Sequence, residues 1–282
     1  MRRIIQFVLM FAACWFAADV ARAADISAPS HAVAGTDVSL PPTGSGSATL
    51  YVFGPGTAIK KDVRLGDNVS LPLKRAGRYT AIVNGGAVTF DVAPAAVSEI
   101  AFLARPSRVP ADRKDVITGT VFIFDHNYNL VTTPTPIKFD LTVAGGQPQS
   151  RNVESKNGVA YVKLDSGRKA GQAQFVASVG STSVRRVVTE TAADPCNLRI
   201  HAQPAKTGVT VETDPVKDCA GNPVPDGTIV TITATSPKGR STVDARVKKG
   251  IVKVELPPMQ NATVSVAAGV VMGNEIHVGG GM

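Results

Sequence analysis

A repeat of one turn-and-strand segment constrains this chain more than any other feature of its sequence. Residues 123–139 read I-F-D-H-N-Y-N-L-V-T-T-P-T-P-I-K-F, and residues 216–232 read V-K-D-C-A-G-N-P-V-P-D-G-T-I-V-T-I. In both copies an alternating strand runs into Asp, Asn follows four residues later, and a second alternating strand comes after the turn. The matched positions keep an offset of 93 residues: Asp125 with Asp218, and Asn129 with Asn222. The constant offset predicts two copies of one structural unit.

The first 23 residues have the composition of an export signal. Two arginines follow Met1, residues 4–18 are largely apolar, and Ala21-Arg22-Ala23 is an A-x-A cleavage pattern. The apolar stretch is shorter than the roughly 20 residues that a membrane span needs. We therefore expect residues 1–23 to be a cleaved signal peptide. The alternative is a lipoprotein that is lipid-modified at Cys14.

Two cysteines remain once the signal is removed, Cys196 and Cys219. Two thiols in an exported chain point to a disulfide, because the compartment beyond the inner membrane is oxidising. A metal pair is the alternative, but neither thiol has a C-x-x-C or H-x-x-x-H neighbour. We predict one Cys196–Cys219 disulfide, which would contribute about 3 kcal/mol in the chain-entropy model.

The remainder of the chain has the pattern of an all-β protein with several domains. Turn signals recur every 8 to 12 residues, and helical periodicity is almost absent. After the signal peptide we expect three β-sandwich domains, at residues 24–97, 98–191 and 192–278. The last four residues, 279–282, are Gly-Gly-Gly-Met and are expected to be a disordered tail.

The repeated segment resembles a known family. The pattern Asp-x-x-Gly-Asn-Pro-Val-Pro-x-Gly-Thr, an alternating strand and then Gly-x-x-x-Val-x-Leu is similar to the group 1 bacterial immunoglobulin-like domains of the invasin and intimin type. The third domain matches at Asp218, Gly221, Asn222, Pro223, Val224, Pro225, Gly227, Thr228, Gly250, Val254 and Leu256. The second domain matches at Asp125, Asn129, Val131, Gly158, Val162 and Leu164, but has Tyr128 and Leu130 in place of Gly and Pro.

The resemblance implies a tandem array of three immunoglobulin-like sandwiches, although the first domain shares only the general sandwich pattern. By family, such domains serve as rigid stalks and adhesive tips on bacterial surfaces. The motif is specific for the fold and says little about function, because one fold hosts many functions.

Charge and aromatic content exclude some classes of partner. The formal net charge is +8, or +6 without the first 23 residues, and residues 98–191 carry +4 of it. Lys and Arg are mostly scattered among polar strand positions, which indicates a solvated face, and we expect no nucleic-acid partner. The one Trp leaves with the signal peptide, so any platform for stacking sugars or bases would rely on a few Phe and on Tyr51, Tyr79, Tyr128 and Tyr161.

No catalytic constellation is visible. The sequence contains no G-x-S-x-G, H-E-x-x-H or phosphate-loop motif, and the four histidines are not spaced as ligand pairs: His31, His126, His201 and His277. His126, between Asp125 and Asn129, suggests a base or a calcium loop. The same Asp and Asn recur in the third domain without His, which favours hydrogen bonds to the turn's own backbone. We therefore expect no catalytic residue, metal or cofactor.

Calcium at the domain junctions is a separate question. The nearby acids do not have ligand spacing: Glu99, Asp112 and Asp115 at the first junction, and Glu190 and Asp194 at the second. The composition leaves junction calcium open without favouring it.

These observations favour an exported, non-enzymatic binding or adhesion module of the bacterial envelope or surface, periplasmic, surface-bound or secreted. Its partner would be a protein or a cell-surface polymer. The alternative is a structural or accessory subunit of an envelope or extracellular assembly that docks by strand addition at a sheet edge. The extended residues 24–34 could donate such a strand, although we expect them to be a frayed terminus.

Overall fold

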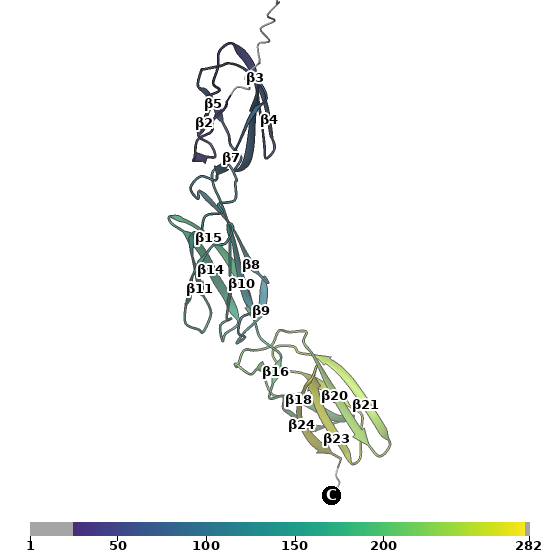
Figure 1. Ribbon diagram of the computed structural model, residues 1–282. Coiled ribbons are helices and arrows are strands. Elements are labelled where there is room, and N and C mark those ends of the chain that lie inside the picture. The colour runs from purple at the N-terminus through teal and green to yellow at the C-terminus, as the bar shows by residue number, and fades with distance from the viewer. Residues whose placement is uncertain (1–24, 280–282) are drawn as a thin grey trace, which may run out of the picture. The chain divides into compact units, whose positions relative to one another are not determined.

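The computed structural model describes residues 25–279, in which all regular structure is β-strand (Figure 1). The predicted signal peptide with Cys14, and the last residues of the predicted tail, lie outside the described part. No helix within residues 25–279 is long and apolar enough to cross a membrane. The predicted all-β sandwich architecture is confirmed.

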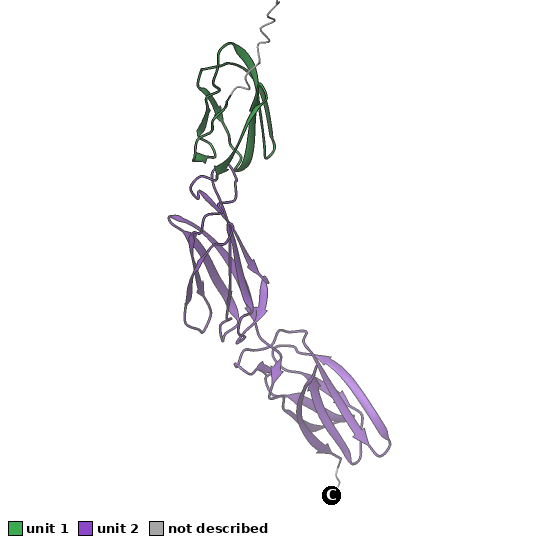
Figure 2. Ribbon diagram, in the orientation of Figure 1, with its two compact units in different colours: residues 1–93 green, residues 94–282 purple. Residues whose placement is uncertain are grey.

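The chain forms two compact units, residues 1–93 and 94–282 (Figure 2). The first unit has one hydrophobic core and the second has two, one on each side of residue 191. We call these parts of the second unit the middle sandwich and the C-terminal sandwich. The unit boundary lies four residues before the expected limit at 97, and the three-way division with its limits stays a prediction.

In the described part of the first unit, residues 25–93, seven strands form two sheets. The sheet orders are β1-β7-β6-β3-β4 and β2-β5. Alternation sets the core, since Tyr79, Ala81 and Val83 of β6 share the buried face and are fully enclosed. The strands are β1 (Ala32–Val33), β2 (Asp37–Leu40), β3 (Ser47–Gly54), β4 (Thr57–Arg64), β5 (Val69–Pro72), β6 (Gly77–Val83) and β7 (Gly86–Ala93).

The start of the described chain is packed rather than frayed, so the expectation for residues 24–34 was wrong. Ile26 is buried and forms a bridge with Pro42. β1 then pairs in parallel with the end of β7, where Ala32 lies opposite Val92. The apolar Ile26, Ala32 and Ala34 gain burial in their own sandwich, which stabilises this segment against fraying.

The middle sandwich places a three-stranded and a five-stranded sheet face to face around an aromatic core. The orders are β13-β10-β8 and β12-β11-β14-β15-β9. Phe102, Phe139 and Phe175 fill the interior, with ring centroids 5.0 Å apart for Phe102 and Phe175. The strands are β8 (Glu99–Arg105), β9 (Arg108–Pro110), β10 (Ile117–Phe124), β11 (Pro136–Thr142), β12 (Gln149–Glu154), β13 (Val159–Leu164), β14 (Gly171–Val179) and β15 (Thr182–Thr191).

The C-terminal sandwich repeats this arrangement with an aliphatic core. Its sheets have the orders β17-β18-β22, β21-β20-β23-β24 and β16-β19. The central strand β18 lies between β17 and β22, as β10 lies between β8 and β13. The strands are β16 (Pro195–Cys196), β17 (Ile200–Ala205), β18 (Gly208–Thr213), β19 (Lys217–Asp218), β20 (Ile229–Ser236), β21 (Gly239–Arg246), β22 (Lys253–Leu256), β23 (Ala262–Ala268) and β24 (Val271–Val278).

Gly119 on β10 tests the packing of the middle core. A Cβ at this position would lie 2.5 Å from Cζ of Phe175 and 3.1 Å from Cε2 of Phe102. Gly119→Ala should therefore overpack the core and lower the free energy of unfolding by about 1 to 3 kcal/mol. Chemical denaturation would measure the change. The exposed Thr142→Ala serves as a control and should stay within about 0.5 kcal/mol; equal effects would contradict the packing.

Candidate functional site

The repeated Asp–Asn turns are the most conspicuous polar feature of the second unit. Asp125 follows β10 and is fully buried. One carboxylate oxygen accepts the backbone N–H groups of Asn127 and Asn129, at 2.8 and 2.9 Å. The other accepts Asn129 Nδ2 at 2.9 Å and the backbone N–H of Ala95, also at 2.9 Å. The carboxylate therefore joins its own turn to the segment that enters the sandwich.

The turn at Asp218 has the same construction. Oδ1 accepts the backbone N–H of Asn222 at 2.8 Å, and Oδ2 accepts Asn222 Nδ2 at 2.9 Å. Oδ2 also accepts the backbone N–H of Ala193, at 3.0 Å. Ala193 precedes β16, as Ala95 precedes β8. Each Asp thus holds the entry segment of its own sandwich through one backbone amide.

The two departures of the middle sandwich from the family pattern fit this geometry. Tyr128 stands where the C-terminal copy has Gly221, and both have a positive φ, 59° and 86°. The turn therefore keeps its left-handed residue at the cost of strain in Tyr128. Leu130, in place of Pro, packs over Gly158, where an added Cβ would lie 2.4 Å from Cγ of Leu130.

The pKa values of both turn carboxylates are lowered. Burial of Asp125 acts in the opposite direction and raises its pKa, but the hydrogen bonds from Asn129, Ala95 and Asn127 outweigh it. The same balance lowers the pKa of Asp218, where the donors are Asn222, Ala193 and Ala220. Both groups are ionised at neutral pH and act as acceptors only. Neither is suited to proton transfer near pH 7.

Asn222 also binds across the boundary between the middle and C-terminal sandwiches. Its Oδ1 accepts the backbone N–H of Ala170 at 2.9 Å, and its Nδ2 donates to the carbonyl oxygen of Arg168 at 2.9 Å. Both partners lie in the loop between β13 and β14 of the middle sandwich. Asn222 is buried, so these bonds are sheltered from competition with water. They fix the junction between the two sandwiches.

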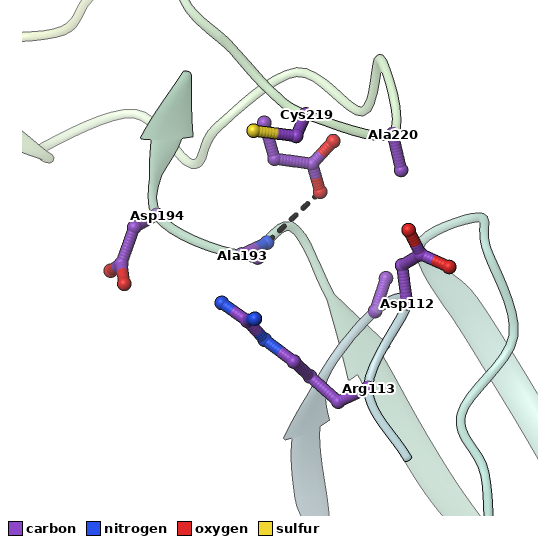
Figure 3. Close-up of a pocket in the computed structure, with 8 residues that line it drawn as sticks. Asp112, Arg113, Ala193, Asp194, Cys219 and Ala220 are labelled. Atoms are coloured by element: carbon purple, nitrogen blue, oxygen red, sulfur yellow. Dashed lines mark hydrogen bonds between the residues drawn. The ribbon is translucent and has the colours of Figure 1, made fainter. Parts of the chain in front are cut away.

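A small pocket of about 80 Å³ lies beside this junction (Figure 3). Arg113 extends from the middle sandwich toward Ala193, and Asp112 and Asp194 lie at the sides. Within residues 25–279, no three His, Cys, Asp or Glu side chains are grouped so as to hold a metal ion. In the wall of the pocket, the backbone N–H of Ala193 donates a hydrogen bond to Oδ2 of Asp218.

The predicted disulfide joins the start of the C-terminal sandwich to the Asp–Asn turn. Cys196 and Cys219 are bonded, with Cα atoms 5.0 Å apart. The two-stranded pairing of β16 with β19 places Cys196 opposite Lys217, two residues before Cys219. The bridge therefore reinforces the contact that Asp218 makes with Ala193.

The other residues considered from the sequence do not join this site. His126 Nε2 lies 2.9 Å from Nδ2 of its neighbour Asn127, and the other three histidines are exposed elsewhere: His31 before β1, His201 in β17 and His277 in β24. Glu190 is buried and accepts backbone N–H groups of Gly167 and Ala144. Glu190 is therefore a structural acceptor within the middle sandwich. The roles of Ala95, Ala193 and the loop around Arg168 have no side-chain signature and were not predicted.

Comparison with known proteins places the fold. No protein-family model and no curated protein sequence matches the chain. A solved chain of the adhesin FdeC of Escherichia coli is similar in structure, with 18% identity, a TM-score of 0.63, and coverage of 91% of this chain and 93% of that solved chain. The chain shares the immunoglobulin-like β-sandwich fold of that structure. The predicted resemblance is thereby confirmed at the level of the fold.

Two further bacterial structures share it. The solved chain of InvD of Yersinia pseudotuberculosis is 15% identical with a TM-score of 0.50, and the match covers 90% of this chain and 96% of that solved chain. Invasin, described as a bacterial integrin-binding protein, is 12% identical with a TM-score of 0.50. That match covers 88% of this chain and 57% of the solved invasin chain.

The lowered pKa of Asp218 predicts an acid-dependent loss of stability. A carboxylate with a depressed folded-state pKa stabilises the fold above its unfolded pKa, about 3.9, and loses that contribution as pH falls through the folded value. Asp218→Asn should therefore be less stable than wild type at pH 7, with the difference shrinking below about pH 4. Urea unfolding across this range would measure it. A difference that stays constant to pH 2.5 would contradict the mechanism, and the exposed Asp194→Asn is the control.

The Asn222 bonds predict a protease-resistant junction. Asn222→Ala removes both bonds to the loop that contains Arg168 and Lys169, which are trypsin sites. Cleavage there should accelerate several-fold at temperatures well below unfolding, because the loop opens more often. Mass spectrometry of the fragments would locate the cut. Asn129→Ala, at the matched position of the other turn, controls for general destabilisation; equal acceleration by both variants would contradict a specific junction contact.

Proposed function

We propose that this chain is an exported, non-enzymatic binding or adhesion module that acts at the bacterial envelope or cell surface. The observation that carries the proposal is that the polar groups of the Asp–Asn turns are already hydrogen-bonded within the protein. The carboxylates of Asp125 and Asp218 accept hydrogen bonds from the protein's own turn and entry backbone. These carboxylates therefore stabilise the fold, and neither is free to act as an acid, base or nucleophile on a substrate.

A fixed junction suits a protein that presents surfaces to a partner. Asn222 bonds the C-terminal sandwich to the middle one, and the disulfide and Asp218 hold the segment between them. Binding by a preorganised surface avoids the entropy of ordering it on association. FdeC is described as an adhesin and invasin as an integrin-binding protein, which supports a similar class of role here.

The proposal also covers the location of the protein and the class of its partner. The Cys196–Cys219 bond needs an oxidising compartment to form and persist. We infer a periplasmic, surface-bound or secreted location, with lipidation at Cys14 as the minor alternative. The partner is a protein or a cell-surface polymer.

The alternative, docking by strand addition, has less support. The segment that would donate a strand is already paired within its own unit through β1 and β7. In the same sheet, the edge strand β4 carries exposed Lys60, Lys61 and Arg64. Charged side chains on an edge oppose pairing with a further strand.

Crosslinking of intact cells that produce the full chain, followed by fractionation and mass spectrometry, tests the proposal. The chain should appear in the envelope or extracellular fraction, crosslinked to a protein or polymer of that compartment. A cytoplasmic chain, or one that stays free of crosslinks in every exported fraction, would contradict it. A chain crosslinked through β4 to a repeating subunit would favour the strand-addition alternative.

A further inference from the structure

The outer face of the sheet β13-β10-β8 in the middle sandwich is apolar at its centre. Thr120 of β10 lies directly opposite Leu103 of β8 and Tyr161 of β13. The side chains of Leu103 and Tyr161 point away from the core and are 48% and 65% exposed. The next row places Phe122, half-buried, between Ala101 and Val159. One row of this sheet thus exposes large apolar side chains to solvent, and the adjacent row adds the partly exposed Phe122.

Three cations border this surface. In the row beyond Leu103, Thr118 lies between Arg105 and Lys163. Arg186 of β15 reaches the edge of β8, because its Nε donates to the carbonyl oxygen of Phe102 at 3.1 Å. Among the ion pairs of residues 25–279, none includes these three cations. The rim therefore carries positive charge that no ion pair of the described residues neutralises, while the acidic Glu99 lies on the same face at the other end of β8.

The C-terminal sandwich shows that the fold does not require this surface. The row equivalent to Leu103, Thr120 and Tyr161 contains His201, Glu212 and Lys253. Lys253 Nζ and Glu212 Oε2 form an ion pair at 3.5 Å. The row equivalent to Arg105, Thr118 and Lys163 contains Gln203, Thr210 and Glu255. Two copies of one sheet thus keep the same backbone pairing and differ in the chemistry they show to solvent.

The opposite sheet of the middle sandwich gives a second comparison. Most outward positions of β11 and β14 are polar and include Lys138, Asp140, Gln172 and Gln174. The apolar exceptions on this face are Val176 of β14 and Val187 of β15. Lys138 and Asp140 form an ion pair at 3.0 Å. The two sheets of the middle sandwich therefore differ in the side chains they show to solvent. The first unit also exposes an aromatic pair, Tyr51 and Phe53, with Lys60 opposite Tyr51. A localised apolar centre with a charged rim is the composition of a protein interaction site.

We propose that the face formed by Leu103, Phe122 and Tyr161, with its basic rim of Arg105, Lys163 and Arg186, docks an acidic polypeptide segment that carries an apolar anchor side chain. This inference rests on the proposed binding function and assigns it a surface and a partner chemistry. The rim selects negative charge by complementarity. The apolar centre of Leu103 and Tyr161 suits an apolar side chain of a polypeptide, as at the core of other protein interfaces.

A displayed library of random 12-residue peptides, selected on the purified chain, tests the proposal. Peptides rich in Asp and Glu around one large apolar residue should be enriched, and their affinity should fall as salt rises. Leu103→Ser with Tyr161→Ser should weaken the selected peptides about tenfold or more, as for the central anchors of other interfaces. Arg105→Glu with Lys163→Glu should abolish the preference for acidic peptides.

The matched control is His201→Ser with Lys253→Ser, at the equivalent positions of the C-terminal sandwich, which should leave peptide binding unchanged. Thermal unfolding should confirm that all variants are folded. The proposal is overturned by a library that yields no acidic consensus, or by peptides that bind the Leu103 and Tyr161 variant as well as wild type. It is also overturned if the chain binds heparin, an anionic polysaccharide, but no peptide. Each of these results leaves crosslinking in the envelope, and hence the broader binding function, untouched.

Discussion

A buried carboxylate that must be satisfied by backbone amides organises the second unit. An ionised side chain without partners in an apolar interior destabilises a fold by several kcal/mol, whereas one with several donors is stable. Asp125 is enclosed completely and Asp218 almost completely. Each therefore requires the Asn four residues later and one amide from the incoming chain. The local turn and the path of the entry segment are consequences of the same requirement.

The strands and the turn chemistry could be predicted from the sequence because both depend on local information. Alternation places Tyr79 and Ala81 on one face of β6, and the positions of Asp and Asn indicate hydrogen bonds to the turn backbone. The cysteine count indicates the disulfide, which the structure forms. The strands and turns depend on residues that are close in the sequence. The disulfide could be predicted because only two cysteines remain after the signal peptide.

The remaining contacts could not be predicted because they depend on distant backbone. The amides of Ala95 and Ala193 have no side-chain signature, and Asn222 meets the loop around Arg168 only after two sandwiches are formed. The packing of Ile26 against its own sandwich depends on a parallel pairing that the alternation pattern does not encode. That Leu103 and Tyr161 lie in one outer row could be known only from the register of the strands. The sequence repeat does not reveal it, because the outward residues differ between the two copies of the sheet.

Native-state hydrogen exchange at the amides of Ala95 and Ala193 is the measurement that tests this account most directly. The account predicts that both amides are protected far above the level of a solvent-exposed linker. It also predicts that Asp125→Asn reduces protection at Ala95 alone, and that Asp218→Asn reduces protection at Ala193 alone. Exchange at the unprotected rate for both amides in the wild-type protein would contradict the claim that buried carboxylates hold the entry segments.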